Sequence, residues 1–355
     1  MNGQQSRAVM MAIGSAVLFG ASTPLAKLLL GAGMNPWLLA GLLYLGSGLG
    51  LAMLHLAGRA RGGPAAEAPL ERRDLPWLAL VVLAGGVIGP VLLMLGLART
   101  PASSAALLLN LEGLATMGIA WLWFRENVDR RLLLGAFAIL AGALLLSWQA
   151  GSSGIGVGAV AIVGACFAWG IDNNLTRKLS AADPVQIAMI KGLVAGLVNL
   201  GLAMTRGVAL PMPMQLATAA AVGFFGYGIS LVLFVLALRN LGTARTGAYF
   251  STAPFIGAVL AIALFGEPVT GQLLAAAALM GIGLYLHLAE RHEHEHAHEP
   301  LVHAHRHVHD AHHQHTHDRE DPAGEPHTHP HRHPPMTHRH PHYPDLHHRH
   351  GHRHA

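Results

Sequence analysis

The chain has 355 residues, of which 52% are hydrophobic and 12% are charged. A soluble domain carries about 25% charged residues, so this composition argues against a soluble protein. The formal net charge of +4 averages over two unlike parts, because only nine of the 19 Asp and Glu residues precede Glu290, while all histidines except His55 and His287 follow it.

A bilayer core of about 30 Å requires about 20 apolar residues in a helix. The first apolar run follows MNGQQSR and is too long for the core of a signal peptide, so we expect it to be an uncleaved first span. Short polar or Pro/Gly-rich turns separate it from further runs of the same kind. We predict ten spans, at residues 8–30, 36–57, 75–97, 102–124, 131–148, 156–178, 184–204, 215–238, 243–265 and 271–289.

Lys and Arg residues gather on one side of the predicted membrane, and such residues mark the cytoplasmic side. If the N-terminus is cytoplasmic, the cytoplasmic loops hold eleven of them and the opposite loops hold two, Arg99 and Arg206. An even number of spans then places the C-terminal tail in the cytoplasm too. We therefore expect a multi-pass protein of the inner, or plasma, membrane with both termini cytoplasmic.

The two halves of the chain repeat each other. WLWFRENVDRRLLLGAFAILAGALLL aligns with IALFGEPVTGQLLAAAALMGIGLYLH, and SAVLFGASTPLAK aligns with ACFAWGIDNNLTR, which matches Gly20 with Gly170. Because each half has an odd number of spans, the second copy must be inverted in the membrane, as in many secondary transporters. The expected fold is an all-α integral membrane protein with two inverted five-helix repeats, at 1–148 and 149–290, followed by a disordered tail at 291–355.

These features resemble the drug/metabolite transporter superfamily, in particular the EamA-type ten-span permeases. The resemblance covers about 8–290 and rests on Phe19-Gly20 and Trp169-Gly170, on the Ala/Thr-rich starts of spans 4 and 9, and on the two Glu-x-Val turns. The chain departs from the usual pattern at Phe19, where tryptophan is more common, and at Arg125. The resemblance implies secondary transport, often export, of small metabolites without naming one substrate.

Few charged residues fall inside the predicted spans, where a charge costs about 2.5–3.5 kcal/mol on insertion scales and usually faces a cavity. Glu112 lies near the middle of span 4, just past Asn110, and its repeat mate is Ala253. A lone carboxylate at this depth is suited to carry a proton. The alternative is a static hydrogen-bonded side chain.

Other polar side chains in the spans are candidates for the substrate or coupling-ion path. Asp172 and Asn173 either line the path or cap the end of span 6, and Lys191 either pairs with Glu112 or Asp172 or extends to the membrane interface. Tyr249 either contacts a ligand or packs. Glu126 and Glu267 lie at span ends, where we expect a structural role at helix termini.

The tail has many prolines and no apolar periodicity, so it cannot bury a core. Neutral imidazole binds divalent transition metals such as zinc, nickel, cobalt and copper, and alternate residues of an extended chain point the same way. The tail therefore predicts metal binding, for buffering, sensing or delivery, and its alternative is a cationic segment that binds metals only in vitro. The candidate ligands are His292, His294, His296, His298, His303, His305, His307 and His309.

Three functions remain open. We favour a gradient-coupled exporter of a small organic metabolite that requires no cofactor, over a divalent-metal (Ni, Co or Zn) exporter supplied by the tail and over a membrane-anchored metal buffer. The sequence has no Walker-type GxxxxGK[ST], HExxH, nucleophile elbow or CxxC motif, so we expect no enzymatic activity. The expected partners are the lipid bilayer, a small-molecule substrate, divalent metal ions and, as an option, a second copy in a homodimer; no feature indicates nucleic acid.

Overall fold

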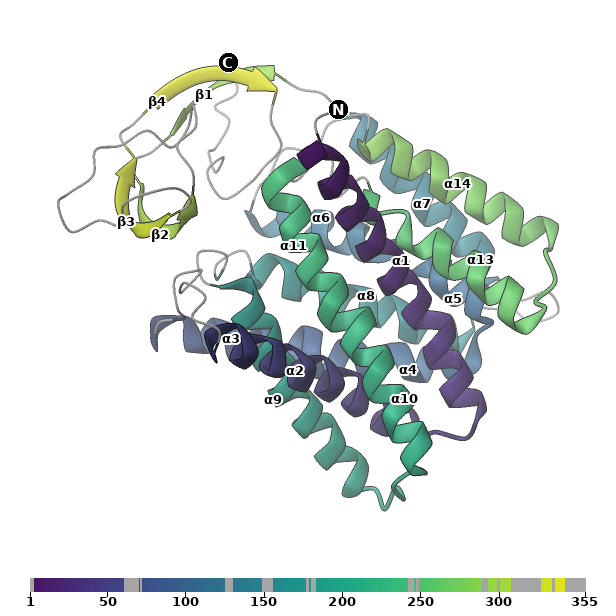
Figure 1. The fold of residues 1–355 in the computed structure, drawn as a ribbon. Helices are drawn as coiled ribbons and strands as arrows, with labels where there is room; N and C mark the ends of the chain where they lie inside the picture. The colour runs from purple at the N-terminus through teal and green to yellow at the C-terminus, as the bar shows by residue number, and fades with distance from the viewer. Residues whose placement is uncertain are drawn as a thin grey trace.

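The computed structural model describes residues 3–60, 70, 72–124, 130–148, 156–176, 179, 183–241, 246 and 249–288, together with 293–298, 301–307, 327–333 and 336–341 of the tail. Each of the ten predicted spans corresponds to helical segments in this part of the chain (Figure 1). The helices form one bundle, and the strands of the tail lie beyond the end of the bundle at which α1 begins. We call that end the tail end and the opposite end the far end.

The first repeat contains five spans, two of which are subdivided. The third span joins a 3-10 turn, two α-helices and a π-helical segment, and the fourth joins two α-helices. The elements are α1 (Gly3–Gly31), α2 (Pro36–Ala60), η1 (Arg72–Asp74), α3 (Leu75–Val81), η2 (Val82–Ile88), α4 (Gly89–Arg99), α5 (Ala102–Leu108), α6 (Leu111–Phe124) and α7 (Arg130–Ser147).

The second repeat follows the same plan, with a π-helical segment in its third span. Its elements are α8 (Val157–Thr176), α9 (Pro184–Met204), α10 (Pro213–Gly223), η4 (Phe224–Ile229), α11 (Ser230–Leu241), α13 (Ala253–Phe265) and α14 (Gly271–Leu288). The predicted ninth span, 243–265, differs from the structure, because residues 251–252 form a turn and α13 begins only at Ala253.

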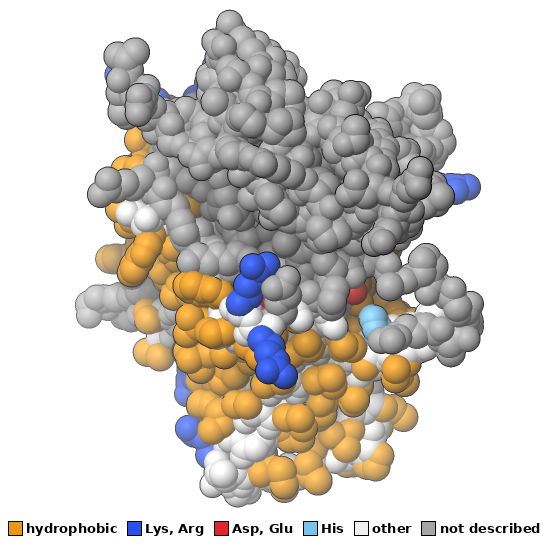
Figure 2. All heavy atoms as spheres, turned by 90° about the vertical axis from the view of Figure 1, so that its left-hand side faces the viewer, with side chains coloured by type: hydrophobic (Ala, Val, Ile, Leu, Met, Phe, Trp, Pro, Cys, Tyr) orange, Lys and Arg blue, Asp and Glu red, His pale blue; other side chains and the backbone are white. Residues whose placement is uncertain are grey.

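The outer surface of the bundle is suited to lipid. Within the described residues, seven helical segments are long and apolar enough to cross a membrane by length and composition, and α13 and α14 are shorter apolar helices. Large apolar side chains point outward, among them Leu122, Trp123 and Phe137. On the face shown in Figure 2, hydrophobic side chains cover most of the described surface. The chain is therefore a multi-pass membrane protein.

The packing of the helices repeats across the two halves. In the first half α1 packs against α11 and α13, and in the second half its counterpart α8 packs against α4 and α6. The remaining large contacts join counterparts directly, α2 with α9 and α7 with α14. This reciprocal pattern is what a two-fold relation between the repeats produces, and it confirms the two-repeat architecture.

Glycines allow the backbones to approach closely at matched positions. A side chain at Gly20 would meet the backbone of α13 at Ala253 and Gly257, and a side chain at Gly170 would meet α6 at Ala115 and Thr116. In the same way Gly192 of α9 lies against the backbone of Gly48 in α2. Small residues at such crossings let membrane helices pack by van der Waals contact.

The middle of the bundle departs from regular helix at matched places. In η2 the N–H of Gly89 donates to the carbonyl of Ala84, and in η4 the N–H of Ser230 donates to that of Phe225, each five residues back. The fourth span breaks after Leu108, and the ninth has a turn before Ala253. Irregular backbone at this depth occurs where it is buried in protein or lines a cavity.

The described parts of the tail differ from the expected disorder. β1 (Glu293–His298) pairs antiparallel with β4 (Met336–Pro341), and β2 (Leu301–His307) pairs antiparallel with β3 (His327–His333). The physical reason is the alternation of the sequence, whose period of two is that of a strand, and backbone pairing needs no apolar core of its own. The register sets histidines opposite histidines, as in His303 and His331.

The close approach of α2 and α9 predicts opposite effects for two glycines of α9. Gly192→Ala places a methyl group against the backbone of Gly48 and should destabilise the protein by about 1–3 kcal/mol. Gly201→Ala, where nothing lies within 4 Å, should be neutral or stabilising by up to about 1 kcal/mol, since alanine favours helix. Thermal unfolding of both variants in detergent checks this, and equal melting temperatures would contradict it.

Candidate functional site

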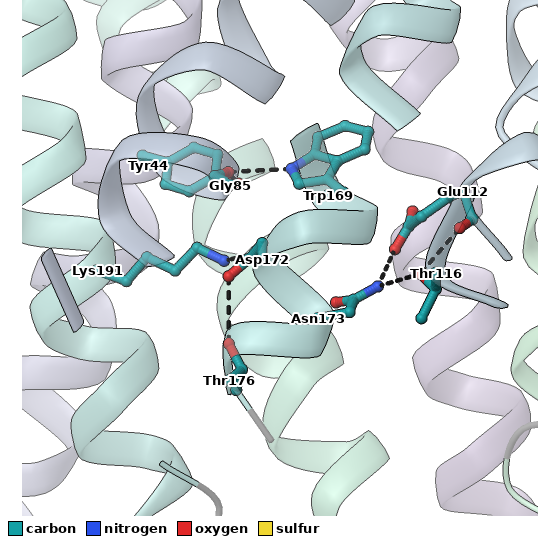
Figure 3. Close-up of polar contacts among 9 residues, drawn as sticks. All are labelled: Tyr44, Gly85, Glu112, Thr116, Trp169, Asp172, Asn173, Thr176 and Lys191. Carbon is teal, nitrogen blue, oxygen red and sulfur yellow. Dashed lines mark hydrogen bonds and ion pairs between the residues drawn. The ribbon is translucent and has the colours of Figure 1, made fainter. Parts of the chain in front are cut away.

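Two adjacent residues of α8 make polar contacts with different neighbouring helices (Figure 3). Asn173 reaches α6, which belongs to the first repeat, and Asp172 reaches α9 of its own repeat. Successive residues of a helix point about 100° apart, so neighbours in sequence serve different partners. The polar stretch predicted in span 6 is therefore divided between two contacts.

Glu112 lies in the first turn of α6, because the break after Leu108 gives this helix its own N-terminus. The Nδ2 of Asn173 donates to Glu112 Oε1 at 3.1 Å and to Thr116 Oγ1 at 3.1 Å. The hydroxyl of Thr116 in turn donates to the backbone carbonyl of Glu112 at 2.9 Å. Among the described residues no cation forms an ion pair with Glu112. Its carboxyl group is therefore held by an amide that accommodates either charge state.

Asp172 has a cationic partner. Lys191 Nζ forms an ion pair with Asp172 Oδ2, and Thr176 Oγ1 donates to Asp172 Oδ1 at 3.2 Å. The two charged side chains are 19% and 5% exposed, respectively. Of the two partners considered for Lys191, the structure selects Asp172. The pair is neutral as a whole, and among the described residues of this region Glu112 is then the acidic group without an ion-pair partner.

The π-helical segment η2 faces the same region. The carbonyl of Gly85 accepts hydrogen bonds from Tyr44 Oη at 2.7 Å and Trp169 Nε1 at 3.0 Å (Figure 3). The carbonyl of Gly86 accepts one from Asn199 Nδ2 at 2.9 Å. A side chain at Gly85 would overlap Asp172. These glycines thus expose backbone acceptors and leave room for the Asp172 carboxylate.

The polar residues of this site gather where α6 and α9 flank α8. The corresponding helices in the opposite repeat are α13, α2 and α1, respectively. Five of these polar residues have apolar or glycine mates in the other repeat, although the backbone contacts are alike, whereas Asp172 and Asn173 match the smaller polar residues Ser22 and Thr23. The matched pairs are Glu112 and Ala253, Thr116 and Gly257, Trp169 and Phe19, Lys191 and Leu43, and Asn199 and Leu51. Because the apolar versions support the same packing, the polar versions are not needed to build the scaffold.

Aromatic rings gather on the α1–α11 side of the bundle. Phe19 lies 5.9 Å from Tyr227 and 5.3 Å from Phe250 between ring centroids, and Phe250 lies 4.8 Å from Phe234. Tyr227 also contacts Tyr44, at 5.6 Å, which joins the aromatic rings to the polar residues around η2. We call these rings the aromatic cluster. The centre of the bundle is therefore polar on the α6–α8–α9 side and aromatic on the α1–α11 side.

The structure brings Glu112, Asp172, Asn173 and Lys191 into one region, but not Asn110. Asn110 Nδ2 donates to the carbonyl of Leu107 at 2.8 Å, across the break between α5 and α6. Tyr249 supplies its backbone carbonyl to the hydroxyl of Thr252 in the turn before α13. Both residues contact broken helix ends rather than Glu112.

Of the two glutamates expected at helix ends, the structure describes Glu267 only. Glu267 follows α13 and accepts hydrogen bonds from the backbone N–H groups of Ala102 at 2.7 Å and Ser103 at 2.9 Å, at the start of α5. It also contacts the Ser103 hydroxyl. Its repeat mate Glu126 lies outside the described residues.

The candidate metal ligands of the tail are placed only in part. His294, His296, His298, His303, His305 and His307 lie in β1 and β2, whereas His292 and His309 lie outside the described residues. In the part of the chain that is described, no three His, Cys, Asp or Glu residues come together as a metal site.

Sequence reasoning missed Thr116, Tyr44 and Asn199. A single hydroxyl or amide in an apolar run carries no signal of its own. The paired glycines at 85–86 in the third span were the available indication, since glycine in a helix marks close approach.

Comparisons with known proteins place the chain. The sequence profile of the EamA-like transporter family matches residues 6–148 and 156–289, one match for each repeat. An uncharacterized transporter of Methanothermobacter thermautotrophicus is 30% identical over 270 residues, which span 72% of this chain and 78% of the relative. A probable terminal-alkyne amino-acid exporter of Streptantibioticus cattleyicolor is 26% identical over 240 residues, 66% of this chain and 80% of the relative.

A protein of known crystal structure shares the fold, with a TM-score of 0.57 at 21% identity over 79% of this chain and 96% of that one. The family match covers both repeats and the fold agrees with it. The chain is a membrane transporter that belongs to the EamA-like transporter family.

Proposed function

We propose that this transporter exports a small organic metabolite and that Glu112 couples export to the proton gradient. One observation carries the proposal: Glu112 is a carboxyl group inside a membrane span that has an amide partner, Asn173, and no cation among the described residues. Such a group can gain or lose a proton without breaking an ion pair. Asp172 cannot do so, because Lys191 neutralises it.

The contact of Glu112 also joins the two repeats. Glu112 belongs to α6 in the first repeat, and Asn173 belongs to α8 in the second. Inverted-repeat transporters alternate access by moving one repeat against the other around a central site. A change of charge at Glu112 therefore acts on a contact that this motion must alter.

Exchange of solute for protons requires the two to compete for one site. The ammonium group of an amino-acid-like solute competes with a proton for a carboxylate, whereas an anionic solute does not. The aromatic cluster opposite Glu112 suits an apolar part of the same solute. The name of the Streptantibioticus relative, an amino-acid exporter, agrees with this class.

No observation favours metal export instead, since the described residues hold no metal-binding group of three or more side chains. The orientation we propose keeps the termini in the cytoplasm. Exposed Arg72, Arg73, Arg130 and Arg131 at the tail end support it, as does the scarcity of cations at the far end.

For the tail we propose reversible binding of a divalent transition metal. The support is the density of imidazoles after Glu290 and the general affinity of neutral imidazole for zinc, nickel, copper and cobalt.

Glu112→Gln should abolish export while leaving the protein folded, because glutamine keeps the hydrogen bond with Asn173 but cannot release a proton. Mass spectrometry of the medium of expressing cells, for organic solutes and for metals, measures the effect against wild type. Asp74→Asn, a carboxyl change at the very start of the third span and away from the Glu112 contacts, is the matched control and should export normally. Undiminished export by Glu112→Gln would remove the proposed role.

Lys191→Met should destabilise the protein by about 3–5 kcal/mol, since it leaves the carboxylate of Asp172 buried without its partner. The double change Lys191→Met with Asp172→Asn should restore most of that stability. Thermal unfolding in detergent gives the comparison, and the export assay applied to the double variant then separates a structural pair from one that transport requires. A double variant no more stable than Lys191→Met would show that the pair is not the cause.

Removal of the tail after Glu290 should eliminate zinc binding by the purified protein and leave export intact, because the tail lies outside both repeats. Isothermal titration with zinc compares the two lengths of chain. Equal zinc binding by both would assign the metal to another part of the protein.

A further inference from the structure

A cavity of about 740 Å³ opens at the far end of the bundle, and none of the residues labelled in Figure 3 lines it. It lies among the ends of α4, α7 and α13 and the starts of α5, α8 and α14. Its volume is typical of sites for small molecules, which range over roughly 300–1,000 Å³. Nothing in the transport proposal assigns a ligand to it.

The two cationic side chains of the cavity, Lys27 and Arg99, differ in how many N–H groups remain free to bind a ligand. Lys27 Nζ donates to the backbone carbonyls of Leu97 and Thr100, at the end of α4, and keeps one N–H group. Arg99 lies on the exposed side and donates to the carbonyl of Leu95 at 3.3 Å. Most of its five N–H groups therefore remain available.

The one carboxylate in the cavity lining, Glu267, is already satisfied. Both of its oxygens accept backbone N–H groups, from Ala102 and Ser103, and one of them also contacts the Ser103 hydroxyl. Two cations against one committed anion leave the cavity with a net positive charge and unused donors. Such a site recognises an anion.

The wall also has uncharged polar side chains such as Ser104 and Gln272, and an apolar part that includes Leu108, Leu146, Trp148 and Leu273. Leu108 ends α5, and Glu112 follows one turn deeper on the same span. The cavity wall at Leu108 therefore lies about one helical turn along the chain from Glu112. A ligand that fits has one carboxylate and a short apolar body.

We propose that this cavity binds the carboxylate of a small organic solute through Lys27 and Arg99, at the mouth of the transport path. Its role in releasing the exported solute rests on the proposed function. Binding of the carboxylate does not rest on the proposed function, so the cavity site and the transport proposal can be tested separately.

The test uses one reporter cysteine at the cavity. Cys166 is buried and is the chain's single cysteine. Ser104→Cys in a Cys166→Ala background therefore gives one reactive thiol, since Ser104 lines the cavity. The rate of alkylation by N-ethylmaleimide is measured in detergent with pentanoate, pentanamide or pentylammonium, which share a five-carbon body and differ in charge.

Pentanoate should slow alkylation and the other two should not. Lys27→Met and Arg99→Gln should each raise the pentanoate concentration needed for half-protection roughly tenfold, the effect of one lost charge-assisted hydrogen bond. Lys27→Arg should keep the protection. Because Arg99 is exposed, its variant remains informative if Lys27→Met fails to fold.

Equal protection by all three compounds, protection by none, or protection unchanged in Arg99→Gln would overturn the proposal. Glu112→Gln in the reporter background should retain protection by pentanoate. If it exports nothing yet is protected, the cavity site and the proton site are independent. If it exports normally and is protected, the transport proposal fails while the cavity site stands.

Discussion

Inside a bilayer every backbone N–H and C=O group must find its partner within the protein, because the hydrocarbon offers none. Regular helices meet this requirement by themselves. The π-helical segment η2 does not, and the carbonyls of Gly85 and Gly86 accept side-chain donors from Tyr44, Trp169 and Asn199 instead. The irregular backbone thus recruits polar side chains from three other helices. The region that can host a polar solute is built by the same constraint that makes the rest of the bundle apolar.

The backbones of the two repeats pack alike, but the polar side chains at their centre differ, so the requirements of packing can be told apart from those of the site. Gly20 and Gly170 bring helices together in the same way, yet the α6 partner of Gly170 carries Glu112, whereas the α13 partner of Gly20 carries Ala253. A requirement of folding would apply to both repeats. Glu112 of the first repeat and Asp172 and Lys191 of the second each have an uncharged mate, and burying an ion pair such as Asp172 and Lys191 seldom stabilises a protein more than apolar packing does. Packing of the repeats alone therefore does not account for these charges.

The sequence allowed the spans, the repeats and the central acidic residue to be predicted, because all three rest on hydrophobicity and on residue identity. The break at residues 251–252 and the segments η2 and η4 were not predictable in this way, since a π-helical turn has the same apolar composition as an α-helical one. The choice of Asp172 over Glu112 as the partner of Lys191 depends on which face of α8 meets α9, which periodicity alone does not fix. In the tail, an alternating pattern permitted strands that a search for apolar faces overlooked.

The two polar sites proposed along the path have opposite charge, and that difference gives the path a direction for a zwitterion. At the centre Glu112 offers a carboxylate for which an ammonium group and a proton compete. At the far end Lys27 and Arg99 offer cations, with Glu267 already bound to the start of α5. A solute that carries both charges would exchange its ammonium for a proton at Glu112 and then be drawn by its carboxylate toward the far end. A simple anion would be repelled at the first site and a simple cation at the second, so the arrangement selects for the pair of charges on one molecule.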